Sequence, residues 1–132
     1  MSAIAIRPRR LVARAREILL AGNGTLTGAR VLVLGVTYKP GVQDVRESPA
    51  LEIISELIDD GVDVQYADPY VPDLQVLGRT LKRVATPDSA SPWDLVVVHT
   101  AHPNVDHTWL QDCAHVLDAT YRAVDLAHRT TI

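Results

Sequence analysis

A loop rich in charged side chains follows the first long apolar run of the chain. It contains two cations, Lys39 and Arg46, and Tyr38 stands beside the lysine. A lysine meets a phosphate as a point charge, whereas an arginine can grip two phosphate oxygens at once. Tyr38 could stack on a base or sugar, and Asp44 and Glu47 could pair with the cations and order the empty loop. The loop is a candidate anion site. A surface loop with incidental salt bridges is the alternative that the charges leave open.

The glycines of this loop exclude two familiar phosphate sites. A dinucleotide fingerprint needs G-x-G-x-x-G, so that the backbone can approach a pyrophosphate closely. Here Gly35 is followed by Val36 and Thr37, and the next glycine is Gly41. The G-K-[ST] sequence of a P-loop is absent as well. The loop is therefore not an NAD site by itself. It is a different kind of anion site, leading into a helix N-terminus, an end that favours anions.

Alternating strands and helices must position the loop. Apolar runs predict strands at 30–36, 62–68, 94–100 and 115–120, a weaker strand pattern at 82–85, and helices at 8–21, 48–60 and 106–114. Ser48 is a good N-cap for the middle helix, and Pro49 suits its first position. The predicted fold class is α/β, a Rossmann-like parallel sheet with helices on both faces, preceded by an N-terminal helix.

Ligands of such sheets bind beyond the carboxyl ends of the strands. In the predicted fold that edge consists of residues 36–48, 67–73, 100–105 and 118–122. The charged loop is the first of these segments, so the candidate anion site lies on the expected ligand edge.

Length and composition limit the classes of function. At 132 residues the chain fits one domain, and we divide it into an N-terminal helix with its connector (1–28) and an α/β domain (29–132). The formal net charge of -3 argues against nucleic-acid binding. Arginines are nevertheless dense in the first sixteen positions. A solvated helix face, or a surface that meets another domain, is the favoured interpretation, and contact with anionic lipid or RNA stays open.

Other features concern the cellular setting and metals. No apolar run reaches membrane-spanning length, and the N-terminus lacks the apolar part of a signal peptide, so no membrane partner is expected. The single cysteine, Cys113, excludes an internal disulfide and fits a reducing cytoplasm. His99, His102 and His107 are not expected to hold a metal, because strand alternation points His99 away from its neighbours and no cysteine lies nearby.

One long segment closely resembles a known family. Residues 28–72, GARVLVLGVTYKPGVQDVRESPALEIISELIDDGVDVQYADPYVP, resemble the start of the C-terminal, UDP-binding domain of the UDP-glucose/GDP-mannose dehydrogenase family. The pattern G-x-x-x-K-x-x-x-x-D-x-R-x-S-P matches from Gly35 to Pro49, and D-P-Y matches at 68–70. WDLVVVHTAH at 93–102 continues the likeness. Enzymes of this family oxidise the C6 hydroxyl of a nucleotide sugar to a carboxylate with two NAD.

The resemblance implies a role for several residues by position. Tyr38 and Lys39 resemble the pair that meets the nucleotide sugar, and Asp44 would order their loop. Arg46 resembles the arginine that reaches the NAD pyrophosphate across the domain cleft. His102 lies near the ligand edge and is a substrate-binding candidate. The implied ligand is UDP or a UDP-sugar. NAD is implied only together with the family's N-terminal domain, which a separate chain could supply, and none is expected to bind tightly here.

The chain departs from the family at the chemistry itself. The family's catalytic cysteine stands in a G-G-x-C context, whereas Cys113 stands in LQDCAHVL and is predicted to be a small buried residue. The arginine that often follows the aspartate near residue 118 is replaced by Ala119, and Arg122 is the nearest substitute. We therefore expect a nucleotide-sugar-binding domain of an NAD-dependent 6-dehydrogenase that is not catalytic by itself. A stand-alone regulatory or carrier protein and a protein-interaction module are the alternatives.

Overall fold

The computed structural model describes residues 8–37, 45, 48–85, 87, 93–102, 105–113, 115–118 and 129–131. In chain order its elements are α1 (Pro8–Asn23), β1 (Arg30–Leu34), α2 (Pro49–Asp59), β2 (Asp63–Ala67), β3 (Gln75–Val76), β4 (Arg79–Thr80), β5 (Leu95–Val98), a 3-10 helix η1 (Thr108–Asp112), β6 (Val116–Asp118) and β7 (Arg129–Thr131). Most of the predicted elements are confirmed, with ends that differ by at most two residues.

The main sheet has five parallel strands in the order β2-β1-β5-β6-β7. The predicted weak strand at 82–85 is only a bridge. Arg83 pairs with Tyr66 of β2, Tyr66 N donates to Lys82 O at 3.1 Å, and Val84 N donates to Tyr66 O at 2.8 Å. The fold class is confirmed as α/β with a parallel sheet, and every crossover joins strands that run in the same direction.

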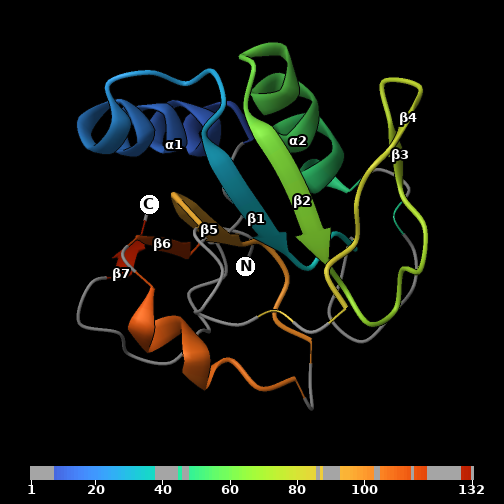
Figure 1. Cartoon of the computed structure of the whole chain (residues 1–132). Coiled ribbons are helices and arrows are strands. Elements are labelled where there is room, and N and C mark those ends of the chain that lie inside the picture. The colour runs from blue at the N-terminus through green and yellow to red at the C-terminus, as the bar shows by residue number, and fades with distance from the viewer. Residues whose placement is uncertain are drawn as a thin grey trace.

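Each face of the sheet is covered by helix. α1 and α2 lie together over one face (Figure 1), where their apolar stripes pack on alternate residues of the strands, such as Val33 and Val97. On the other face, Leu110 of η1 packs with Leu32 and Val96, and Trp109 lies beside this cluster. The short helix predicted at 106–114 is confirmed, and it is of the 3-10 type. η1 has five residues and no side-chain cap at its start, and such short turns adopt the tighter 3-10 form.

The start of α2 follows the predicted capping. Ser48 has extended backbone angles, and its hydroxyl accepts a hydrogen bond from Ala50 N at 3.3 Å. Pro49 occupies the first helical turn, where its missing N–H costs nothing. The helix ends at Asp60 and Gly61, and Gly61 has a φ of +88°. The segment at 36–48 therefore has fixed structure on both sides, β1 before it and a capped helix after it.

A small hairpin, β3–β4, was not predicted. Its strands pair antiparallel across Leu77 and Gly78, which both have positive φ, 55° and 73°. Such two-residue turns usually carry Asn-Gly, because asparagine tolerates the left-handed region better than leucine does. With leucine in that place, the turn had no recognisable sequence pattern.

Candidate functional site

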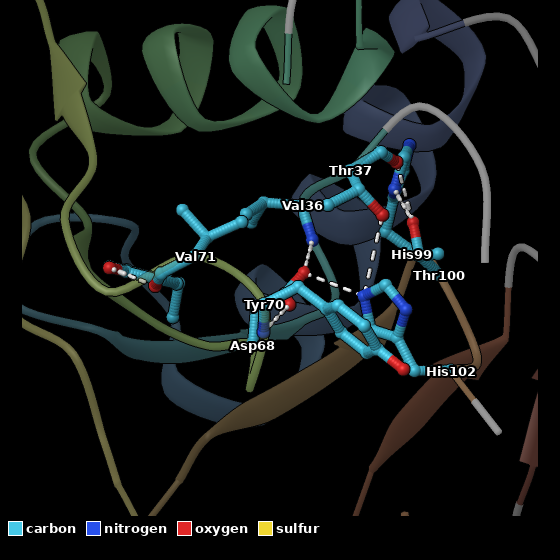
Figure 2. Close-up of polar contacts among 9 residues, drawn as sticks. Val36, Thr37, Asp68, Tyr70, Val71, His99, Thr100 and His102 are labelled. Atoms are coloured by element: carbon cyan, nitrogen blue, oxygen red, sulfur yellow. Dashed lines mark hydrogen bonds and ion pairs between the residues drawn. The ribbon is translucent and has the colours of Figure 1, made fainter. Parts of the chain in front are cut away.

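The site lies where the sheet changes direction. From β1 the chain passes through α2 to β2 on one side, whereas from β5 it passes through η1 to β6 on the other side. The connections from β1 and β5 therefore lead to opposite sides of this strand pair, and ligands of open α/β sheets bind at such a switch point. Polar residues gather here from three strand ends (Figure 2). Thr37, Asp68, Thr100 and His102 are buried, and His99 is half-buried.

Asp68 is the centre of this group. Its side chain is buried (2 % exposed), directly after β2. Oδ2 accepts a hydrogen bond from Val36 N at 2.8 Å and lies 2.8 Å from Nε2 of His102. Oδ1 accepts from Tyr70 N, also at 2.8 Å. The three donors belong to the segments that follow β1, β5 and β2, so one carboxylate joins all three strand ends.

The imidazole ring of His102 makes polar contacts through Nε2 and stacks on a neighbouring aromatic ring. Since Nε2 faces the Asp68 carboxylate, this nitrogen carries the proton that it donates. The same nitrogen lies 3.3 Å from Thr37 Oγ1, and the imidazole stacks on Tyr70 with 4.5 Å between ring centroids. A hydrolytic triad places the acid and the hydroxyl at opposite nitrogens of the histidine ring. Here Asp68 and Thr37 both lie at Nε2, so these three side chains do not form such a triad, and the two contacts fix the position of the ring.

Gly35 permits the loops after β1 and β5 to touch. Its φ is +77°, and a Cβ at this position would lie 2.1 Å from the carbonyl oxygen of Thr100. The close approach is reinforced by Thr100, whose hydroxyl donates to Thr37 O at 2.9 Å and whose N–H donates to Leu34 O at 3.1 Å. Only glycine fits here, for both conformation and space.

His99 completes the network from β5. Its Nδ1 lies 2.8 Å from Thr100 Oγ1. Because that hydroxyl gives its only proton to Thr37 O, Nδ1 is the donor in this contact. Burial lowers the pKa of His99 to about 4, against the opposing effects of a hydrogen bond with the Gly35 backbone and of the Asp68 charge. His99 is therefore a neutral donor at pH 7, and it orients Thr100.

A pocket of about 120 Å³ opens beside the network, on the side of η1. Its lining includes Asp68, Thr100, Arg83, His107 and Trp109. Burial lowers the pKa of His107, which favours its neutral form. Ligand pockets commonly measure roughly 300–1,000 Å³, so this pocket is sized for one part of a ligand. The lining combines a cation, a carboxylate, an imidazole and an indole, which suit a polar, planar group.

The predicted site residues fall into two sets. Tyr38, Lys39, Asp44 and Arg46 lie outside the described residues. His102 lies at the predicted ligand edge and is only 4 % exposed, inside the network. Its contact with a substrate stays a prediction.

Three members of the network, Thr37, Thr100 and His99, were not predicted as site residues. Asp68 was noted only as part of D-P-Y. That pattern was the one available signal for the network, and it carries no information about which backbone groups the aspartate would meet.

Cys113 is confirmed as buried, at 8 % exposure, and burial raises the pKa of its thiol. Trp93 and Trp109 pack at the edge of the apolar cluster that contains Leu110. Within the described residues, no three histidine, cysteine, aspartate or glutamate side chains gather closely enough to hold a metal ion.

The comparison with protein families decides the relationship. The model described as "UDP-glucose/GDP-mannose dehydrogenase family, UDP binding domain" matches residues 32–129. The chain belongs to this family. The match begins in β1 and ends in β7, and it includes the whole network around Asp68. Among the helices that the structure describes, none is long and apolar enough to cross a membrane.

Individual dehydrogenases of the family share parts of the sequence. The UDP-glucose 6-dehydrogenase of Rhizobium meliloti is 36% identical over 66 residues, 50% of this chain and 15% of that enzyme. The UDP-N-acetyl-D-mannosamine dehydrogenase of Methanocaldococcus jannaschii is 50% identical over 44 residues, 33% of this chain and 10% of that enzyme. The chain thus spans a small part of the length of these relatives.

Solved structures of family dehydrogenases share the fold. The UDP-D-ManNAc dehydrogenase of Pyrococcus horikoshii matches 94% of this chain with a TM-score of 0.69 and 23% identity, using 29% of its own length. A UDP-glucose dehydrogenase from Pyrobaculum islandicum matches 87% of this chain with a TM-score of 0.62 and 28% identity, using 26% of its length. Both likenesses extend over most of the chain, α/β sheet included.

Proposed function

We propose that this chain is the nucleotide-sugar-binding part of an NAD-dependent UDP-sugar 6-dehydrogenase, and that it binds the UDP moiety at the carboxyl edge of its sheet. The observation that carries the proposal is the match of residues 32–129 to the UDP-binding domain of the family. The switch point between β1 and β5 supports it, because the loop with Tyr38 and Lys39 starts there. A cytoplasmic setting is part of the proposal, since a lone buried thiol suits a reducing compartment.

We further propose that binding and oxidation are separable in this chain. Oxidation of an alcohol to an acid needs a hydride acceptor over C6, a base, and a thiolate to trap the aldehyde. Burial raises the pKa of Cys113, so this thiol is a poor trap at neutral pH. Arg46 would contribute one edge of an NAD site, and a domain carrying the glycine fingerprint would contribute the rest. The chain is thus expected to bind UDP modestly and free NAD weakly.

Calorimetric titration with UDP tests the proposal. If Lys39 faces the diphosphate, Lys39→Ala should weaken binding by about 1.5–3 kcal/mol, the range for a charge-assisted hydrogen bond. Arg16→Ala is the matched control. It removes a cation that pairs with Asp60, at the end of α2 remote from Ser48, and should leave UDP affinity unchanged. Equal affinity of wild type and Lys39→Ala would remove Lys39 from the site.

A second measurement separates binding from catalysis. The purified chain is mixed with NAD and several UDP-sugars, and NADH absorbance is followed. No turnover is expected. Turnover by this chain alone would overturn the separation of binding from oxidation. An absence of UDP binding at millimolar concentration would overturn the binding proposal and favour an interaction module.

A further inference from the structure

We propose that Asp68 is a positioning residue for the nucleotide loop: it fixes the point and direction from which the chain leaves β1, and thereby sets the affinity for UDP without contacting UDP. This inference rests on the proposed function, and it assigns a role to a residue that the family pattern marks only as part of D-P-Y.

Burying the Asp68 carboxylate has an energetic cost. A buried carboxylate loses its hydration, which is compensated only if its oxygens find hydrogen-bond donors. Asp68 finds three at 2.8 Å: Val36 N, Tyr70 N and His102 Nε2. An apolar side chain would avoid the cost of burying a charge, but it would leave these three donors without an acceptor. The carboxylate does what no apolar residue can, since it fixes the relative positions of three groups from three separate segments.

Val36 and Thr37, which connect β1 to the loop, are both restrained. Val36 follows the sharp bend at Gly35, and its N–H is held by Asp68. Thr37 is held through its carbonyl by Thr100, and its hydroxyl lies 3.3 Å from His102. The last two described residues before the loop are thus restrained by contacts from β2 and β5. Tyr38 and Lys39 come directly after this fixed point, so a shift of Val36 displaces both.

Asp68→Asn tests the proposal with a minimal change of shape. An amide has one acceptor oxygen, so in either orientation its NH2 group faces at least one of the former donors. UDP affinity is expected to fall about tenfold in the folded variant. Asp94→Asn is the matched control, since Asp94 accepts from Arg30 N at 2.8 Å at the opposite end of β1. It makes the same chemical change and should leave UDP affinity within about twofold.

Amide hydrogen exchange supplies a readout that does not depend on ligand. Asp68→Asn should speed exchange at Val36 or at Tyr70, whichever N–H then faces the amide NH2 group, whereas Asp94→Asn should leave exchange at both of these residues unchanged. If Asp68→Asn does not fold, His102→Phe replaces it. That variant keeps a ring on Tyr70 but removes one donor, and it should also speed exchange at Val36.

The outcomes separate the two proposals. Wild-type UDP binding with unchanged affinity in folded Asp68→Asn would overturn the positioning role. Equal losses of affinity in Asp68→Asn and Asp94→Asn would also overturn it, because they would reflect stability alone. If the wild type does not bind UDP, the proposed function and the effect on UDP affinity fail together. Unchanged exchange at both Val36 and Tyr70 in folded Asp68→Asn would show that Asp68 does not restrain these segments. Where Asp68→Asn does not fold, unchanged exchange at Val36 in His102→Phe would show the same.

Discussion

The two edges of the sheet are held together by different means. At the amino edge, Asp94 receives one backbone N–H from Arg30, whose guanidinium lies 4.8 Å from the ring centroid of Trp93. Nearby, Arg16 and Asp60 form a partly exposed ion pair. At the carboxyl edge, Asp68 receives three hydrogen bonds in the interior (Figure 2), next to a glycine that has no room for a Cβ.

The contacts at the amino edge contribute to the stability of the fold, whereas those at the carboxyl edge fix the relative positions of particular groups. The side-chain contacts at the amino edge are partly exposed, so water can substitute for a lost partner. Contacts at the carboxyl edge share atoms, and a group that loses its partner there stays buried without one. Polar groups are expensive to bury, so their concentration at one edge indicates that this edge needs a fixed arrangement more than it needs stability.

The largest contrast is expected between two glycines. Gly35→Ala places a Cβ 2.1 Å from a backbone oxygen, and backbone cannot move aside cheaply. At Gly61 of the amino edge, φ is also positive, but the Cβ would lie 3.1 Å from the Thr27 hydroxyl, which can rotate. We expect Gly35→Ala to lose at least about 4 kcal/mol of unfolding free energy, and Gly61→Ala about 1–2 kcal/mol. Urea unfolding measures both. Equal losses would break the comparison.

The response to acid should arise at the carboxyl edge. Burial lowers the pKa of His99 from 6.5 to about 4, so below pH 6.5 the unfolded chain binds a proton here that the folded chain refuses. The stability that comes from keeping His99 neutral is fully present above pH 6.5. It is lost as the pH falls toward 4, by about 3 kcal/mol.

The variant His99→Asn isolates this effect. An asparagine amide can still donate toward Thr100 but does not titrate. Unfolding free energies measured across this pH range should decline less steeply in the variant than in the wild type. Parallel curves for the two proteins would mean that His99 keeps its ordinary pKa in the folded chain.

The cap of α2 gives an intermediate effect. Ser48 is buried, and its hydroxyl accepts from Ala50 N at a rather long 3.3 Å. Ser48→Ala should cost about 1 kcal/mol of stability, the usual value for an N-cap. If this helix end also lines the anion site, UDP affinity should fall with it. A loss of stability with unchanged UDP affinity would confine Ser48 to a structural role.

The smallest effect is expected at the amino-edge ion pair. Arg16 Nε lies 2.7 Å from Asp60 Oδ2, but the arginine side chain is 37% exposed. Such pairs contribute less than about 1 kcal/mol and are screened by salt. Arg16→Ala should therefore destabilise slightly at low ionic strength and hardly at all in about 1 M salt. A salt-independent loss would make this pair resemble the buried contacts of the carboxyl edge.

Much of the fold could be predicted because local patterns were strong. Continuous apolar runs such as 30–36 identify strands buried on both faces, and Ser48-Pro49 identifies a helix start. Where local pattern and structure disagree, tertiary context decided. Leu77 occupies a turn position that its sequence does not favour, and the segment at 82–85 meets β2 at a single residue instead of extending along it.

The candidate site was predictable in place but not in detail. The carboxyl edge follows from the strand alternation, and the family resemblance supplied Tyr38, Lys39 and Arg46. The network around Asp68 could not be predicted, because two of its partners are backbone groups, Val36 N and Tyr70 N. Nearly every residue has a backbone N–H, so the residue types do not indicate which one a carboxylate will meet. Closure of the network depends on the positive φ of Gly35 and on the register between β1 and β5. Both are properties of the folded chain.

The bridge beside β2 has a consequence for concentrated solutions. β2 ends the sheet on one side, and an open strand edge is a template on which a second molecule can add a strand. Both backbone groups of Tyr66 that face outward are already taken by Lys82 and Val84, and Lys82 and Arg83 place exposed charge next to them. A second molecule therefore cannot pair with β2 at Tyr66. The segment 82–84, which is not itself a strand, should in this way reduce edge-to-edge aggregation into fibrils.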